Sequence, residues 1–440
     1  MHMRTLIVMS IAIALNAVAR ASDMIPAKPQ AAAILLGGGD VYTVSGDVIR
    51  GGSVLVENGK ITAVGSNVSG SASAQRIDCS GKRIYPGLIH GNTELGLVEI
   101  DAVRATVDQS ETGAINPNAR AEVAVNPDSE LIPVARSNGV LLALTVPAGG
   151  TLCGSSAIIQ LDGWTWEDMT LRAPIAIHLK WPDMAPTRGW WQRDSEKDQL
   201  KKRDEALAQV RKTFDDARAY ANARKAHGPA VGTPDFDARW EAMIPLLDQK
   251  IPLIVHANEL QQIEAAVAFT AKEKVKLIIL GGYDTPRCID LLKKYDVPVI
   301  LDGTQRLPER RGDGYDEAFA VPAKLKEAGV RFCIAADRGA SLARNLPYHA
   351  ATAVAFGLSA DDALKSITLW PAQILGVADR VGSIEPGKDA TLIVTNGDVL
   401  EEPTHVERAF IQGREIDLSN KQTRLWDKYR EKYRRQGLTK

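Results

Sequence analysis

His256 and Asp337 are the side chains whose type and position best suit acid–base or metal chemistry. Each ends a short apolar run that is typical of a buried strand. An imidazole or a carboxylate in such a position can bind a divalent metal or take a proton from an attacking water. Structural alternatives remain open for both. His256 could hydrogen-bond to Asn258 or Glu259, while Asp337 could pair with Arg338 or cap the following helix.

A further carboxylate, Glu94, lies in the segment Tyr-Pro-Gly-Leu-Ile-His-Gly-Asn-Thr-Glu-Leu-Gly-Leu at residues 85–97. If Glu94 and Asp337 lie side by side, their repulsion raises the pKa of one carboxyl group and leaves the other ionised. Such a pair can supply an acid and a base in one site. We therefore list both residues as catalytic candidates.

The elements that must position these residues alternate between apolar strands and helical stretches. Seven strands are expected at 88–95, 139–146, 175–181, 252–256, 276–280, 297–301 and 331–336, with an eighth near 157–161. This alternation predicts β/α units around a parallel sheet, and eight strands predict a (β/α)₈ barrel. In such barrels the chemistry lies at the C-terminal ends of the strands, which is where the candidate residues stand.

Short strand-like runs also occur on both sides of the barrel region. Asn58-Gly59 separates two of them, which is a strong signal for a hairpin. Similar short strand-like runs occur again at residues 382–417. We predict that residues 22–83 and 382–417 pair into one small composite β-sandwich beside a barrel formed by residues 84–381.

Three motifs resemble the metal-dependent amidohydrolase superfamily, especially its imidazolonepropionase-like and dihydroorotase-like members. Residues 54–65 are similar to the family's N-terminal hairpin, 84–89 to its entry into the first barrel strand, and 375–394 to its return into the sandwich. The resemblance covers residues 33–417. It implies a hydrolase of non-peptide carbon–nitrogen bonds that acts on a cyclic amide or related small substrate.

The resemblance also implies a metal site, which is degenerate in this sequence. The family's His-x-His pair on the first strand falls on Asn92 and Glu94. The histidine of the fifth strand falls on His256, and the general-base aspartate of the last strand falls on Asp337. These four residues are the expected metal ligands.

Other positions of the family's site correspond to residues that would line the pocket. Lys180 matches the bridging lysine, or His178 takes its place. Tyr283 lies in the segment where the family has its sixth-strand histidine, and Asp302 follows the seventh strand. These four residues are expected to line a pocket at the mouth of the barrel.

The four expected ligands are rich in oxygen. Tight zinc sites use three or four nitrogen, sulfur or carboxylate donors, whereas Asn92 offers a neutral amide oxygen. The set would suit Mn²⁺, Mg²⁺ or Ca²⁺ better than Zn²⁺. One weakly bound divalent metal (Zn, Mn or Mg) and no metal at all are both left open. A pseudoenzyme that binds a small molecule or a partner is the alternative to a hydrolase, and metal-free carboxylate catalysis is a third reading.

Overall charge limits the partners of this chain. The sequence has 53 Lys and Arg against 54 Asp and Glu residues, so long-range attraction to nucleic acid is not expected. The predicted partner is a small-molecule substrate, and a homo-oligomer is left open.

Residues 1–21 have the pattern of a secretory signal peptide. Arg4 precedes an apolar run at 6–15, and Ala19 and Ala21 precede Ser22. The run is shorter than the roughly 20 residues that a spanning helix needs. We therefore expect export, to the periplasm or out of the cell, and no membrane span.

Residues 418–440 form a predicted basic helical tail. This segment contains eight Lys and Arg residues but only two acidic residues, Asp427 and Glu431. Its apolar and aromatic residues fall on one side of the helix: Leu425, Trp426, Tyr429 and Tyr433. Such a helix could contact an anionic surface or dock back onto the barrel. A second charged segment, 194–226, is predicted to be a long solvated helix.

Overall fold

The computed structural model describes residues 24–189, 191–226 and 235–438, so the predicted leader lies outside the described residues. Eight strands form the barrel sheet in chain order: β6 (Leu88–Thr93), β7 (Val140–Thr145), β8 (Leu152–Gln160), β9 (Thr170–Lys180), β10 (Leu253–Ala257), β11 (Leu277–Gly281), β12 (Val299–Asp302) and β13 (Phe332–Ala335). All eight predicted strands are present. The predicted TIM-like barrel is confirmed.

The barrel departs from the all-parallel expectation at β8, which is antiparallel to both β7 and β9. The connection at 146–151 is a short loop, whereas a parallel crossover needs roughly a dozen residues or more. Only the short α3 (Trp166–Met169) lies between β8 and β9. The eighth strand therefore joins the sheet through hairpin connections and not through β/α units.

Alternate residues of the strands fill the inside of the barrel. Ile89, Ile254, Ile278, Ile300 and Cys333 belong to one buried cluster, while neighbours such as Val255, Ile279 and Ile334 pack outward. The two ends of the sheet meet at Gly91, where a Cβ would lie 3.2 Å from Ile300 Cγ2 and 3.5 Å from Cys333 Sγ. Glycine at this position lets β6 approach β12 and β13, so that the barrel is nearly closed.

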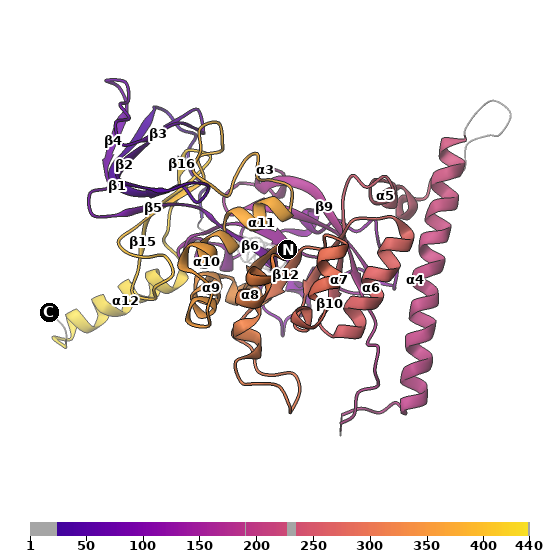
Figure 1. Cartoon of the computed structure of the whole chain (residues 1–440). Helices are drawn as coiled ribbons and strands as arrows, with labels where there is room; N and C mark the ends of the chain where they lie inside the picture. The colour runs from indigo at the N-terminus through magenta and orange to yellow at the C-terminus, as the bar shows by residue number, and fades with distance from the viewer. Residues whose placement is uncertain (1–23, 190, 227–234, 439–440) are drawn as a thin grey trace, which may run out of the picture.

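Helices cover the outside of the barrel (Figure 1). The longest, α4 (Glu196–Lys225), confirms the predicted long helix. The others are α2 (Leu131–Arg136), α5 (Ala238–Leu247), α6 (Leu260–Glu273), α7 (Ile289–Lys294), α8 (Glu317–Ala328), α9 (Leu346–Ala355), α10 (Ala360–Ser366) and α11 (Leu369–Ile374), with the 3₁₀ turns η1 (Arg104–Thr106), η2 (Ala121–Ala124), η3 (Thr285–Arg287) and η4 (Ala340–Asn345).

A second eight-stranded sheet joins both ends of the chain. It contains β1 (Ile34–Tyr42), β2 (Val48–Glu57), β3 (Lys60–Gly65), β4 (Gln75–Asp78), β5 (Arg83–Pro86), β14 (Leu392–Thr395), β15 (Val406–Ile411) and β16 (Arg414–Glu415). The antiparallel pair β5–β14 links the N-terminal and C-terminal segments, as predicted. This sheet continues to Pro86, three residues past the expected boundary. Asn58 and Gly59, with φ of 50° and 77°, form the predicted hairpin turn between β2 and β3.

The mouth of the barrel points downward in Figure 1. The loops that leave the C-terminal ends of β9 and β12 hang at the bottom of this view, and α12 (Lys421–Arg435) extends to the lower left. Within the described ranges, every helix is too short or too polar to cross a bilayer.

Candidate functional site

Two histidines on neighbouring strands form the centre of the mouth. His178 on β9 and His256 on β10 continue the inward-facing rows of Ala176 and Ile254. The distance from His178 Nδ1 to His256 Nε2 is 3.0 Å, and the rings meet edge to face at 66°. His256 therefore bonds to His178, and not to Asn258 or Glu259 as the structural alternative held.

Both imidazoles are held in the neutral form. Packing around His256, together with the nearby charges of Arg338 and Lys180, lowers its pKa to about 3. Complete burial lowers the pKa of His178 well below its usual value, and the charges of His256 and Arg338 lower it further. His178 Nε2 is buried and has no hydrogen-bond partner within the described part of the chain. His178 is thus a fully buried imidazole with one unsatisfied ring nitrogen.

Asp302, at the end of β12, is a buried carboxyl group with a raised pKa. Burial raises its pKa, the hydrogen bond from Asn92 Nδ2 (2.9 Å) opposes that rise, and the charge of Asp337 adds to it. Asn92 Oδ1 is buried and has no partner among the described atoms. Asn92 thus orients Asp302, and a carboxyl pair of Asp302 and Asp337 stands at the mouth.

Asp337 and a third imidazole, that of His349, lie close to the backbone of Gly303. A Cβ on Gly303, whose φ is +77°, would lie 3.2 Å from His349 Cε1 and 3.5 Å from Asp337 Oδ1. His349 Nδ1 accepts a hydrogen bond from the backbone N–H of Thr304 at 3.0 Å. Burial lowers the pKa of His349, and Asp337 opposes this shift. Glycine at position 303 is needed because the chain passes close to both side chains.

Neither structural alternative for Asp337 is found in the part of the chain that the structure describes. Arg338 pairs with Glu94 and not with Asp337, with 3.6 Å between Arg338 Nε and Glu94 Oε2. The residue that precedes η4 is Gly339, with no side-chain cap. Asp337 instead lies close enough for its charge to act on His349 and Asp302.

Glu94 does not form the expected carboxyl pair with Asp337. Burial raises its pKa, while Arg338 opposes that rise. Arg338 also donates from Nη2 to Gln109 Oε1 and to the carbonyl oxygen of Val146, both at 3.0 Å. Asp302 is the carboxyl group that lies near Asp337, and Glu94 instead holds the guanidinium group.

The expected metal ligands are not assembled into a coordination sphere. Nowhere in residues 24–189, 191–226 and 235–438 do three His, Cys, Asp or Glu side chains converge closely enough to hold an ion. Asn92 is engaged with Asp302, Glu94 with Arg338 and His256 with His178. These donors do not fit the three- or four-ligand site of a tightly held zinc ion.

His90, Arg306, Arg338 and His349 lie at or near this site and were not among the predicted site residues. His90 is fully buried, its Nε2 has no partner among the described atoms, and burial lowers its pKa to about 3. His90 and Arg338 are sequence neighbours of Asn92 and Asp337, which was the signal for finding them. Lys180, an expected pocket residue, pairs in register with His256 across the sheet and is exposed at the rim.

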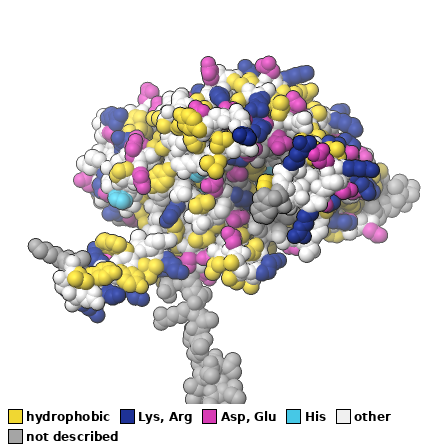
Figure 2. All heavy atoms as spheres, turned by 90° about the horizontal axis from the view of Figure 1, so that it is seen from below, with side chains coloured by type: hydrophobic (Ala, Val, Ile, Leu, Met, Phe, Trp, Pro, Cys, Tyr) yellow, Lys and Arg dark blue, Asp and Glu magenta, His cyan; other side chains and the backbone are white. Residues whose placement is uncertain are grey.

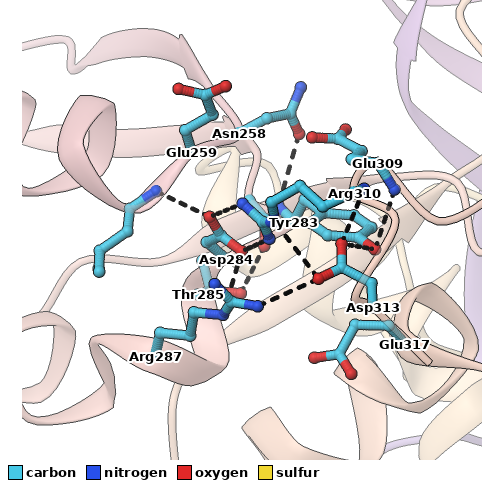
Figure 3. Close-up of polar contacts among 12 residues, drawn as sticks. Asn258, Glu259, Tyr283, Asp284, Thr285, Arg287, Glu309, Arg310, Asp313 and Glu317 are labelled. Carbon is cyan, nitrogen blue, oxygen red and sulfur yellow. Dashed lines mark hydrogen bonds and ion pairs between the residues drawn. The ribbon is translucent and has the colours of Figure 1, made fainter. Parts of the chain in front are cut away.

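Tyr283, another expected pocket residue, belongs to a clamp beside the mouth (Figure 3). Its hydroxyl donates to Asp313 Oδ2 at 2.9 Å and accepts from the backbone N–H of Glu309 at 3.2 Å. Arg310 binds both oxygens of buried Asp284, with 2.7 Å between Nη1 and Oδ2. The clamp fastens the loop 303–316 to the end of β11.

Arg306 connects this clamp to the mouth. Its guanidinium lies over the Tyr283 ring, 5.3 Å from the centroid, and its charge opposes the rise in the pKa of Asp302. A mixture of acidic and basic side chains surrounds the mouth in the view from below (Figure 2). A cavity of about 610 Å³ lies at the opposite end of the barrel, and none of the candidate residues lines it.

Comparisons with known proteins agree with this architecture. The model of the amidohydrolase family matches residues 147–416, more than half of the chain, beginning after β7. The amidohydrolase tasK of Hapsidospora irregularis is 24% identical over 385 residues, which are 79% of this chain and 38% of the relative. The chain thus spans about two fifths of the length of that curated relative.

Solved structures show the same fold. An amidohydrolase from Thermotoga maritima is 25% identical, with a TM-score of 0.77 over 87% of this chain and 99% of that chain. An adenosine deaminase from Xanthomonas campestris with bound zinc is 19% identical, with a TM-score of 0.51 over 92% of this chain and all of that chain, a likeness of fold alone. On the family match and the two-sheet architecture together, this chain belongs to the amidohydrolase family.

Proposed function

We propose that this protein hydrolyses a carbon–nitrogen bond of a small substrate, such as a cyclic amide, at the barrel mouth. The observation that carries the proposal is the pair of carboxyl groups at neighbouring strand ends, Asp302 with a raised pKa and Asp337 beside it. Two carboxyl groups whose environments differ can divide the roles of acid and base. Membership of the amidohydrolase family supports the class of bond.

In the proposed reaction the carboxylate of Asp337 takes a proton from water, and the water oxygen attacks the carbonyl carbon. The carbonyl oxygen gains negative charge, which the guanidinium of Arg338 stabilises. The carbon–nitrogen bond then breaks as Asp302 gives its proton to the leaving nitrogen. Proton exchange with solvent restores both carboxyl groups.

Other mouth residues orient these groups. Asn92 donates to Asp302 Oδ1, which leaves the second oxygen to carry the acidic proton. Glu94 and Gln109 hold Arg338 in place. The unpaired His178 Nε2 supplies a polar contact for the substrate. No step passes through a metal, because the described donors do not fit one.

A panel of cyclic amides, N-acyl amino acids and dipeptides tests the proposal. We expect hydrolysis by the wild-type protein after dialysis against a chelator, and loss of activity in the Asp302→Asn and Asp337→Asn variants. Asp296→Asn is the matched control, because this aspartate is 82% exposed and pairs with Arg331 at 2.8 Å. Activity that appears only on adding Mn²⁺, Mg²⁺ or Zn²⁺ would contradict the metal-free mechanism.

The alternative function is a binding protein without catalysis. Arg338 favours this reading, because its cationic group lies in the mouth near the imidazole pair. Calorimetry with the same panel separates the two functions. Saturable binding without turnover, abolished by Arg338→Met, would support a pseudoenzyme and contradict the hydrolase.

A further inference from the structure

The C-terminal helix α12 has one face that packs against no other element among the residues the structure describes. None of its residues is buried, and its apolar and aromatic side chains are all well exposed: Leu425 41%, Trp426 61%, Tyr429 47% and Tyr433 42%. They form a continuous stripe that is visible in the space-filling view (Figure 2). The structure therefore does not show the docking onto the barrel that the sequence left open.

Among residues 24–189, 191–226 and 235–438, the polar contacts between the helix and the rest of the protein lie near the beginning of the helix. Asn420 caps it by accepting from the backbone N–H groups of Gln422 and Thr423, and donates from Nδ2 to Ser137 Oγ at 3.1 Å. Arg424 pairs with Glu130 at 2.9 Å. Beyond this point α12 projects away from the barrel and the accessory sheet (Figure 1).

Acidic and basic side chains of α12 occupy different positions relative to the apolar stripe. The two acidic residues are neutralised within the helix, Asp427 by Arg430 and Glu431 by Arg434 and Arg435. At 3.6 residues per turn, both acidic residues fall on the side away from the stripe.

Three lysines run along one edge of the stripe instead. Lys421, Lys428 and Lys432 are spaced by seven and four residues, so they share one side of the helix. None of them has an ion pair within the part of the chain that the structure describes. The stripe is thus bordered by cations whose charge is not cancelled.

We propose that α12 binds the surface of an anionic lipid bilayer. A basic amphipathic helix with an aromatic apolar face lies in the plane of such an interface, where lysines meet the headgroups. Trp and Tyr prefer this depth because their rings are apolar and their N–H and O–H groups reach water. A helix–helix partner is less well matched, because a stable seam needs repeated aliphatic residues and this stripe has only Leu425.

Binding through this stripe also sets the direction of the barrel mouth. The stripe is seen in Figure 2 from the side to which the mouth loops point in Figure 1. The molecule would therefore bind with its candidate site facing the lipid surface and not the bulk solution.

Sedimentation of the full-length protein with vesicles tests this proposal. We expect binding to vesicles that contain phosphatidylglycerol in phosphatidylcholine, release by high salt, and no binding to pure phosphatidylcholine. The Lys428→Glu/Lys432→Glu variant and the Trp426→Ser/Tyr433→Ser variant should each lower the binding constant at least roughly tenfold.

The matched control is Lys201→Glu/Lys212→Glu on α4, which makes the same change in charge at a distant exposed helix and should bind like wild type. Circular dichroism verifies folding, and the two α12 variants act on independent features. Absence of binding at low salt, or unchanged binding in both variants, would overturn the proposal. A dimer in sedimentation velocity that Trp426→Ser/Tyr433→Ser dissociates would overturn it too, because the stripe would then belong to a second copy.

Discussion

In the proposed mechanism, the hydrogen bond between Asn92 and Asp302 helps to give Asp302 and Asp337 different roles. The bond to Asn92 Nδ2 fixes one oxygen of Asp302, while burial and Asp337 favour a proton on that carboxyl group. The proposed acid must be protonated to act. Its contribution to the rate is therefore present at pH values below its raised pKa and is lost as the pH rises through it.

The need for a protonated Asp302 leads to a prediction for the dependence of the rate on pH. In wild type we expect kcat/KM to fall on the alkaline side as Asp302 loses its proton. In Asp302→Asn the rate should fall by roughly 10²–10⁴ and the alkaline decline should disappear. Steady-state kinetics across the pH range measure both effects. An alkaline limb that persists unchanged in Asp302→Asn would assign it to another group.

A second prediction concerns the side chain of Arg338. Arg338→Lys keeps a positive charge but cannot bridge Glu94, Gln109 and the Val146 carbonyl oxygen at once. We expect kcat/KM to fall by roughly 10²–10³ because the donor no longer points at the developing oxyanion. Glu94→Gln keeps the shape of the holding residue and should cost less. Equal losses in both variants would indicate that the Glu94 charge is itself needed.

The candidate site could be predicted only in part. His256 and Asp337 could be assigned to the mouth because each ends a strand, and strand ends of a barrel share one rim. The partner of Asp337 could not be inferred in this way, since Glu94 and Asp302 both satisfied the same rule. The ladder between β6 and β7 has register shifts between Leu88 and Ile89 and between His90 and Thr93. Such irregularities change which face later side chains occupy, and the sequence pattern does not reveal them.

At the scale of elements, β8 shows a limit of strand prediction. Its apolar residues indicate a buried strand near 157–161, but an apolar run has no direction. Only the short loop before it requires an antiparallel pairing with β7. The composite accessory sheet was easier to predict, because a hairpin turn and a matching C-terminal motif marked both halves.

The clamp on loop 303–316 gives a prediction at the same scale. Arg310→Ala removes the bidentate partner of Asp284, whose side chain is 2% exposed, and leaves Arg287 at 3.4 Å. We expect a loss of about 1–3 kcal/mol in the free energy of unfolding, because the remaining carboxylate is poorly compensated. KM should also rise, since the loop carries Arg306 beside Asp302. Denaturant melts and kinetics measure the two effects.

The neighbouring Arg311 provides the control for this prediction. Arg311 is exposed and has no ion pair or hydrogen bond within the described ranges, so Arg311→Ala should leave stability and KM unchanged. Equal effects of the two substitutions would mean that overall loop charge, and not the clamp, positions Arg306.

For the whole molecule, histidines that are fully buried (His90 and His178) or partly buried (His256) link stability to pH. Burial lowers the pKa of His90 and of His256 to about 3, and moves that of His178 well below its usual value. In the unfolded chain these groups take up protons near pH 6.5. As the pH falls below about 6.5, these histidines bind protons in the unfolded state but not in the folded state. The free energy of unfolding therefore decreases as the pH falls, down to about pH 3. The raised pKa of Asp302 has the opposite effect on the free energy of unfolding, because this carboxyl group binds its proton more tightly in the folded state.

Glu94, whose pKa is also raised by burial, acts in the same direction as Asp302, and the three histidines should outweigh these two carboxyl groups. We expect the free energy of unfolding to fall by on the order of 3–4 kcal/mol for each pH unit well below 6.5, at about 1.4 kcal/mol for each group. Urea melts between about pH 7.5 and about pH 5 measure this slope. His405→Gln is the control, because this histidine is exposed and its removal should leave the slope intact. A flat profile would show that the mouth admits protons to the imidazoles in the folded state, and the buried neutral pair that supports the proposed mechanism would then have to be abandoned.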